Sequence, residues 1–235
     1  MKPRDHAADH YRRMLSAERH PLERLDGSAA IVKCARNQEI PTGEARGGHW
    51  YCLITGAVRR SAIRHGGRRQ IVELMLPRDF FLVSETQGEE TVEAIAEHTV
   101  LASYPCARVE LLAEQDRQLA QELREIASQS LARTRDQLMI LGGITAVEKV
   151  GSFLLSLDER TSSESGRLDL ALTRYDIAEY LAVSVETVCR AITDLQQRGI
   201  IALVGTRTIK ILDRGALEHR ARKKMNANRK RLIAA

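Results

Sequence analysis

The stretch from Leu172 to Ile201 constrains this chain most, because it carries the start, break and stop signals of two short helices in succession. Thr173, followed three residues later by Asp176, has the spacing of a capping box that opens a helix. Ser184 is placed to cap a second helix, and Gly199 is placed to end it. Apolar residues recur at helical spacing on both sides of the break: Ile177, Leu181, Val188, Ile192 and Leu195.

The pattern predicts a helix-turn-helix over about residues 174–193, whose second helix carries Glu186 and Arg190 on one face. In the DNA major groove, a Glu carboxylate can accept from cytosine N4. An Arg guanidinium can donate to O6 and N7 of guanine, and each good contact contributes about 1–3 kcal/mol of discrimination. The alternative is a solvated surface pair worth a few tenths of a kcal/mol.

The sequence after the second helix indicates a β-hairpin. The run IIALVGTRTIKILD has two β-branched stretches separated by Val204–Thr208, with Gly205 at the bend. A hairpin that follows a recognition helix is typical of a wing. We expect Arg207 at its tip and Arg174 at the start of the first helix to contact phosphates, which position a protein without specifying sequence. Exposed arginines without such a role are the alternative.

The run Val185–Arg190 reads V-E-T-V-C-R, and it resembles the V-E-T-x-[SC]-R pattern of the FNR and FixK-type branches of the CRP/FNR superfamily of bacterial transcription regulators. The whole chain resembles that superfamily more loosely. The resemblance implies that Glu186 and Arg190 read a TTGA-type half-site of a two-fold operator. Two departures are Cys189, where Ser is usual, and Ala182, where Gly is usual; a left-handed Ala costs about 1 kcal/mol. The DNA-binding residues expected are Arg174, Ser184, Val185, Glu186, Thr187, Cys189, Arg190 and Arg207.

From Ala29 to about Pro105 the chain changes to short strand-like runs with turns, including the hairpin signal Gly66-Gly67. Periodicity alone predicts a small antiparallel sheet, and the resemblance implies a β-roll sensor domain like those that bind cyclic nucleotides. We therefore expect an α+β fold with an N-terminal antiparallel β-roll, a long dimerisation helix and a C-terminal winged helix-turn-helix. The expected parts are a flexible segment at 1–28, the β-roll at 29–108, the dimerisation helix at 109–142, the winged domain at 143–215 and a basic tail at 216–235.

A long helix is predicted over Asp116–Leu141, with apolar residues on two sides. One stripe is Leu119, Leu123, Ile126, Ser130, Gln137 and Ile140, and a second is Ala127, Leu131, Thr134, Leu138 and Leu141. Such a helix must be covered twice, once by its own domain and once by the same helix of a second chain. We assign the first stripe to the homodimer interface; a helix buried within one domain is the alternative. Gly142-Gly143 then predicts a hinge, and Thr145 with Glu148 a further capping box.

No cofactor is expected. The four cysteines are scattered without a C-x-x-C motif, which disfavours an iron–sulfur cluster. The stretch Pro77–His98 corresponds to the phosphate-binding cassette of the cyclic-nucleotide branch, and it has Glu85 and Thr91 but lacks the cassette's arginine, which disfavours cyclic AMP. Haem stays open as an alternative, with His49, His65 or His98 as the axial ligand, and a metal clip at His6 and His10 is a further alternative.

Cys189 is the most unusual residue of the predicted DNA face. It precedes Arg190 and lies near the positive end of the recognition helix, a setting that favours the thiolate. Oxidation would add bulk and negative charge against DNA. We hypothesise that Cys189 is a redox brake on DNA binding; a small residue chosen for fit is the alternative.

Charge does not itself indicate DNA binding. The chain has 36 basic and 31 acidic residues, but seven of the basic residues and no acidic one lie in residues 219–235. The tail's apolar end, Leu232–Ala235, resembles tags that bacterial unfoldases recognise, with a fraying terminus as the alternative.

The expected function is a transcription regulator of microoxic or nitrogen-fixation genes, as in FixK-type proteins, active as a homodimer without a small effector. The alternative is an effector-gated regulator of the same fold. The sequence has no apolar run for a membrane span, no signal peptide and no catalytic constellation, so we expect a cytoplasmic protein that is not an enzyme. Its expected partners are double-stranded DNA, a second copy and RNA polymerase, with no membrane.

Overall fold

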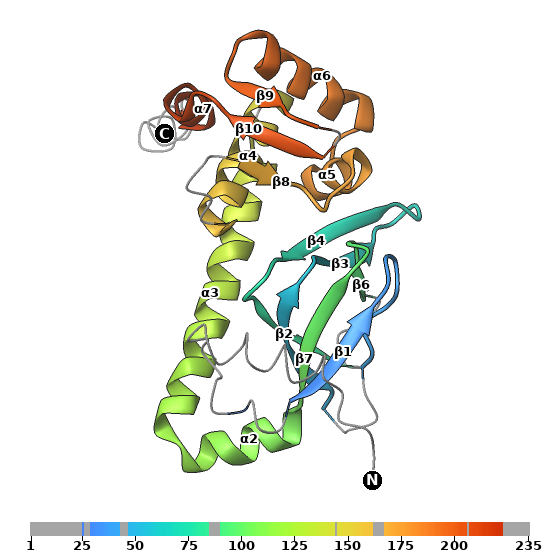
Figure 1. The fold of residues 1–235 in the computed structure, drawn as a ribbon, viewed down its shortest axis with the longest axis vertical. Coiled ribbons are helices and arrows are strands. Elements are labelled where there is room, and N and C mark those ends of the chain that lie inside the picture. The colour runs from blue at the N-terminus through green and yellow to red at the C-terminus, as the bar shows by residue number, and fades with distance from the viewer. Residues whose placement is uncertain are drawn as a thin grey trace. The chain divides into compact units, whose positions relative to one another are not determined.

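The computed structural model describes residue 25 and residues 29–42, 47–84, 90–143, 145–161, 167–205 and 207–222. The chain divides into two compact units, one ending at Thr134 and one beginning at Arg135. The division falls within helix α3 (Arg117–Leu141), which contributes residues to both units (Figure 1). The metal pair His6 and His10 and the tail end Leu232–Ala235 lie outside the described residues.

The first unit contains two antiparallel sheets, which together form the predicted β-roll (Figure 1). The four-stranded sheet has the order β1 (Ala30–Cys34), β7 (Thr99–Pro105), β2 (His49–Thr55) and β5 (Phe80–Val83). The three-stranded sheet has the order β4 (Arg69–Met75), β3 (Val58–Ile63) and β6 (Glu90–Ala94). Short helix α2 (Cys106–Gln115), which the sequence did not distinguish, follows β7.

The predicted hairpin at Gly66-Gly67 joins β3 to β4, and both glycines have positive φ, 93° and 74°. Two of the strand-like runs each contain two strands. The run Trp50–Arg60 breaks at Gly56, where φ is 94°, and the run Thr91–Tyr104 breaks between β6 and β7. These turns return the chain to the opposite sheet, which periodicity within a single run does not reveal.

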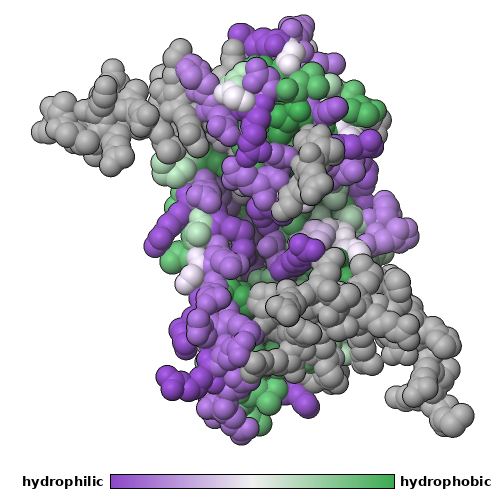
Figure 2. Space-filling model, turned by 60° about the vertical axis from the view of Figure 1, so that its left-hand side comes forward, coloured by the Kyte–Doolittle hydropathy of each residue, from purple (hydrophilic) through white to green (hydrophobic). Residues whose placement is uncertain are grey.

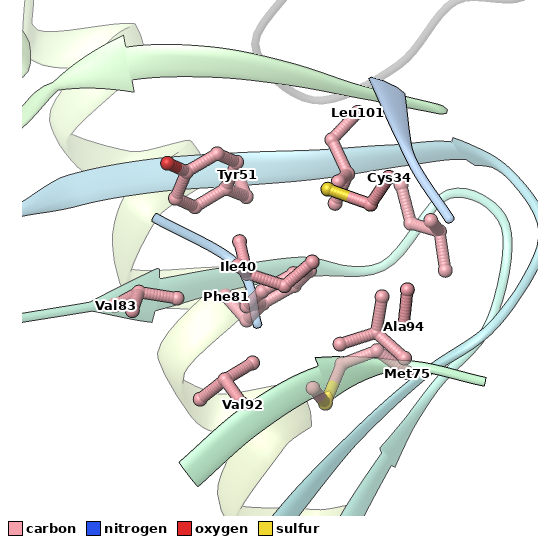
Figure 3. Close-up of a cluster of buried hydrophobic side chains, with 11 residues drawn as sticks. Cys34, Ile40, Tyr51, Met75, Phe81, Val83, Val92, Ala94 and Leu101 are labelled. Atoms are coloured by element: carbon pink, nitrogen blue, oxygen red, sulfur yellow. The ribbon is translucent and has the colours of Figure 1, made fainter. Parts of the chain in front are cut away.

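Alternate residues of β2 enter different cores, as the period of a strand requires. Tyr51 and Leu53 belong to the cluster between the two sheets, where Tyr51 stacks on Phe81 with ring centroids 5.8 Å apart (Figure 3). Cys52 belongs to a second cluster, which joins the four-stranded sheet to α2 and α3 through Val109, Leu119 and Ile126, among others. The β-roll is therefore packed on both sides of its larger sheet.

The packing of α3 corrects our assignment of its two faces. The helix follows Asp116, whose carboxylate accepts hydrogen bonds from the backbone N–H groups of Gln118 and Leu119. The first stripe is covered by the chain itself: Leu119 and Ile126 are 1% and 5% exposed, Leu123 packs on the same cluster, Ser130 bonds to Glu73, and Gln137 and Ile140 are buried. Four of these six residues are buried by the chain itself and the other two are half-buried, which contradicts our assignment of the dimer interface to this stripe.

The second stripe of α3 is exposed. Leu131 and Leu138 are 52% and 63% exposed. In the view of Figure 2, apolar surface patches alternate with hydrophilic ones. Apolar residues that are exposed along one stripe, and not scattered singly over the surface, are typical of an interaction surface. The uncovered apolar face of α3 is therefore the one that contains Leu131 and Leu138.

The second unit is a winged helix-turn-helix. Its elements are α4 (Ala146–Thr161), β8 (Arg167–Asp169), α5 (Arg174–Leu181), α6 (Val185–Gln197), β9 (Ile201–Leu203), β10 (Thr208–Ile211) and α7 (Arg214–Arg222). The strands form an antiparallel sheet in the order β8-β10-β9, so the expected hairpin is present and β8 adds a strand. Helix α7 packs on α4 with Leu217 fully buried, so it extends into the segment that we assigned to the basic tail. None of the described helices combines the length and hydrophobicity that a membrane span requires.

Candidate DNA-binding interface

Helix α5 begins with the predicted capping box. The Thr173 hydroxyl accepts from the Asp176 N–H at 3.2 Å, and the Asp176 carboxylate accepts from the Thr173 N–H at 2.7 Å. The helix ends at Ala182, whose backbone is left-handed, with φ 53° and ψ 46°. The conformation expected at this position is present, and Ala carries the steric cost that a Gly would avoid.

Helix α6 is fixed at both ends and along one side. The Ser184 hydroxyl caps it by accepting from the Thr187 N–H at 3.2 Å, and Gly199, with φ 68°, follows its last turn. Its buried face is an apolar stripe of Val188, Ala191, Ile192 and Leu195. The opposite face is consequently presented to solvent in a defined orientation.

That exposed face carries Glu186, Cys189 and Arg190, while Val185 and Thr187 are half-buried beside it. Within the residues that the structure describes, neither Glu186 nor Arg190 forms an ion pair, either with the other or with a third residue. A surface pair selected for stability would be expected to engage. Both side chains instead keep their hydrogen-bonding capacity for a ligand outside the chain.

Arg174 and Cys189, which the sequence placed on the DNA face independently, interact across the two helices. Burial lowers the pKa of the Arg174 guanidinium from its usual value, and the electrostatic interaction with Cys189 opposes that shift. Arginine stays charged at neutral pH. The first residue of α5 therefore holds a positive charge close to the only exposed cysteine among the described residues. Sequence spacing cannot reveal this neighbour, because the two residues lie in different helices.

The wing carries Arg207, which is exposed. Its backbone carbonyl accepts from the Leu170 N–H at 2.8 Å, and the neighbouring Thr208 hydroxyl donates to Asp169 at 2.8 Å. Strand β8, which the sequence did not predict, thus anchors the base of the wing next to Arg207. Thr206 lies outside the described residues.

The β-roll offers a cavity of about 530 Å³, lined in part by the stretch that we compared with the phosphate-binding cassette. Phe80, Phe81, Leu82 and Glu90 contribute to it, Thr91 is exposed on β6, and Glu85 lies outside the described residues. No histidine lines this cavity within the described part of the chain. His49 contacts the Thr42 carbonyl through Nδ1 at 3.1 Å, and His65 and His98 are exposed. The described residues contain no cluster of three metal-ligating side chains.

A β-roll, a long helix and a winged helix-turn-helix, with a Glu and an Arg presented on the recognition helix, define a DNA-binding transcription regulator. Residues 148–220 match the Crp-like helix-turn-helix domain. The chain is 35% identical over 201 residues to the nitrogen fixation regulation protein FixK of Azorhizobium caulinodans, covering 81% of this chain and 78% of that protein. It is 32% identical over 171 residues to the transcriptional activator protein FnrL of Cereibacter sphaeroides, covering 68% of each.

Among solved structures, that of FixK2 from Bradyrhizobium japonicum superposes with a TM-score of 0.74 at 32% identity, covering 81% of this chain and 96% of that one. The chain belongs to the CRP/FNR family of transcription regulators, as a FixK-type member. The resemblance seen in the recognition helix and the expected fold are thereby confirmed. The names of these two relatives describe a regulation protein and a transcriptional activator.

Proposed function

We propose that this protein is a transcription activator that binds TTGA-type palindromic operators as a homodimer, without a small effector, and that its targets are microoxic or nitrogen-fixation genes. The observation that carries the proposal is the exposed and unpaired Glu186 and Arg190 on a helix fixed by its caps and its buried face. The names of the relatives, a nitrogen fixation regulator and a transcriptional activator, support the sign and the targets.

In this proposal each residue of the interface has a distinct task. Arg190 donates to O6 and N7 of guanine, and Glu186 accepts from cytosine N4. Ser184, Val185, Thr187 and Cys189 pack against the same bases or the flanking backbone. Arg174 and Arg207 neutralise phosphates and set the position of the helix on the duplex. RNA polymerase is the expected protein partner.

We infer a homodimer from the exposed apolar stripe of α3. Its members are separated alternately by four and three residues, the spacing of a coiled-coil seam: Ala127, Leu131, Thr134, Leu138 and Leu141. Two such helices in parallel would cover the exposed leucines and place two recognition helices about a common two-fold axis. We call this set the α3 seam.

The test of base reading is selection of binding sites from random duplexes by the wild type, Glu186→Ala and Arg190→Ala. Each variant should lose preference at one symmetric base pair, by roughly 5- to 150-fold, while its non-specific affinity falls much less. Arg198→Ala is the matched control, because Arg198 is at the end of the same helix and pairs with Asp194 at 2.8 Å. Unchanged preference in Arg190→Ala would contradict the proposed readout.

We further propose that oxidation of Cys189 switches DNA binding off. A peroxide oxygen is transferred to the thiolate: the S–O bond forms, the O–O bond breaks and hydroxide leaves, giving a sulfenic acid, and a second peroxide gives a sulfinate. The negative charge of the sulfinate would repel the DNA phosphates. It would also attract the nearby Arg174 guanidinium, so that Arg174 would no longer contact its phosphate. The exposure of Cys189 and its interaction with Arg174 support the proposal.

Titration with hydrogen peroxide of the wild type and Cys189→Ser, followed by measurement of operator affinity, tests this switch. The wild type should lose affinity and the variant should retain it, because Cys34, Cys52 and Cys106 are buried in both. Equal losses would remove Cys189 as the switch. An absorbance spectrum of the same preparation checks the effector-free state, for which we expect no Soret band.

A further inference from the structure

Arg60 ties the two sheets of the β-roll together inside the cavity. Arg60 is 7% exposed. Its guanidinium donates from Nε to Glu73 on β4 at 3.1 Å and from Nη1 to Glu90 on β6 at 3.5 Å. Its Nη2 donates to the Leu82 carbonyl on β5, in the other sheet, at 2.7 Å. All three guanidinium nitrogens are therefore engaged by the chain itself.

Glu73 continues this set of contacts to α3. Its second oxygen, Oε1, accepts from the Ser130 hydroxyl at 3.3 Å and lies 4.0 Å from Nη2 of Arg133. Nη1 of Arg133 lies 3.6 Å from Asp79, whose other carboxylate oxygen accepts from the Leu76 N–H in the turn before β5. We call Arg60, Glu73, Asp79, Ser130 and Arg133 the roll–helix network.

The network leaves little for an anionic effector to bind. Arg60 already has two carboxylates and a carbonyl as partners, and an incoming phosphate would have to displace them from a guanidinium that is nearly out of water. The remaining walls of the cavity are mostly apolar, including Trp50, Phe80 and Phe81. The charged groups of this cavity are thus already paired with one another.

The cavity also borders the α3 seam. Ala127, Leu131 and Thr134 line it, one helical turn or less from Ser130 and Arg133. The contacts that hold α3 on the β-roll therefore also determine how the helix is rotated about its own axis. This rotation leaves Leu131 exposed.

We propose that the roll–helix network is a built-in substitute for an effector, in which Glu73 and Arg133 are positioning residues that hold α3 so that its seam can pair without a ligand. The inference rests on the proposed effector-free homodimer. It gives a function to charges that no local sequence pattern singles out, and it explains how a sensor-like domain can act with nothing bound.

Arg133→Gln tests this role, because it keeps an unbranched polar side chain and removes the charge and the reach of the guanidinium. The dimer dissociation constant, measured by sedimentation equilibrium, should rise on the order of tenfold, and operator affinity at low protein concentration should fall with it. Arg133→Lys should restore both. Arg135→Gln is the matched control: it lies on the same helix, is exposed and makes no ion pair among the described residues, so both constants should stay at the wild-type values.

Thermal unfolding separates positioning from folding, since Arg133 is a partly exposed residue whose loss should leave the melting of the roll close to that of the wild type. Wild-type dimerisation and operator binding in Arg133→Gln would overturn the inference and leave the proposed function intact. Equal weakening by Arg135→Gln, or no rescue by Lys, would also overturn it. A wild type that dimerises only after addition of a small molecule would instead overturn the proposed function.

Discussion

Ala182 occupies the one position of the helix-turn-helix where the backbone itself disfavours the residue present. Its φ of 53° is in the left-handed region, which Gly enters without penalty and Ala does not. The side chain is exposed, so no core contact compensates for this cost. The chain retains the turn because the caps and apolar faces of α5 and α6 determine it from both sides.

Replacing Ala182 with Gly should therefore stabilise the protein, by about 0.5–1 kcal/mol after the greater chain entropy of Gly is subtracted. Urea unfolding followed by circular dichroism measures the change. Ala132→Gly is the matched control, since Ala132 is an exposed residue inside α3, where Gly should cost about 1 kcal/mol. Loss of stability in both variants would show that the left-handed turn carries no strain.

The raised pKa values of two buried thiols, Cys34 and Cys106, predict how the stability of the protein depends on pH. Burial raises the pKa of Cys34, and burial together with Glu110 raises that of Cys106, both above the usual 9.0. In the alkaline range the folded chain then keeps protons that the unfolded chain releases. The stability contributed by the thiols is complete below about pH 9 and is lost as pH rises through the folded-state pKa values.

The free energy of unfolding under reducing conditions should accordingly fall as the pH rises above about 9, and the fall should be shallower in the double variant Cys34→Ala, Cys106→Ala. Denaturant titrations at several pH values measure this slope. A wild-type stability that is flat or rising over this range would contradict the direction of both shifts.

At the scale of single elements, the sequence predicted best what depends on neighbours along the chain. The capping box of Thr173 and Asp176, the cap at Ser184 and the Gly66-Gly67 hairpin are interactions over three or four residues, and all are present. Strand β8 was missed because its three residues are a strand only through pairing with β10, about forty residues later. Local signals of that length do not distinguish a strand from a loop.

The two faces of α3 show the same limit. Both stripes are apolar enough to be buried, so their spacing predicts two covered faces without saying what covers each. Which face packs on the β-roll is decided by contacts between residues distant in sequence. Examples are the hydrogen bond between Ser130 and Glu73 and the packing of Leu119 and Ile126 on the roll. In the candidate site, the neighbour of Cys189 was missed for the same reason.

The exposed face of α3 gives a direct prediction for its assembly. Leu138→Asp should shift the protein from dimer to monomer in sedimentation experiments, because two carboxylates would face each other in the α3 seam. Leu111→Asp is the matched control: Leu111 on α2 is 56% exposed and is outside the seam, so the dimer should persist. A dimer that survives Leu138→Asp would place the interface elsewhere.

At the scale of the whole molecule, the proposed function depends on joining the recognition helices of two chains. The winged unit holds every proposed DNA contact, whereas the roll and most of the seam belong to the other unit, and α3 belongs to both. The sequence predicted the kinds of these parts and their order, because each is continuous along the chain, whereas the division between the units falls within α3 and not at its end. The two-fold arrangement is a property of the assembly, and it is tested best on the DNA.

A symmetric dimer places its recognition helices about one turn of B-form DNA apart, roughly 34–36 Å or 10–10.5 base pairs. Inserting five base pairs at the centre of the selected operator turns one half-site to the opposite face of the duplex. Affinity measured by fluorescence anisotropy should then fall at least about tenfold, towards that of a single half-site. The same five base pairs inserted outside the operator serve as the control and should leave affinity unchanged. Because two independently bound chains would not sense the phase of the half-sites, equal affinity for both duplexes would show that Glu186 and Arg190 act from monomers.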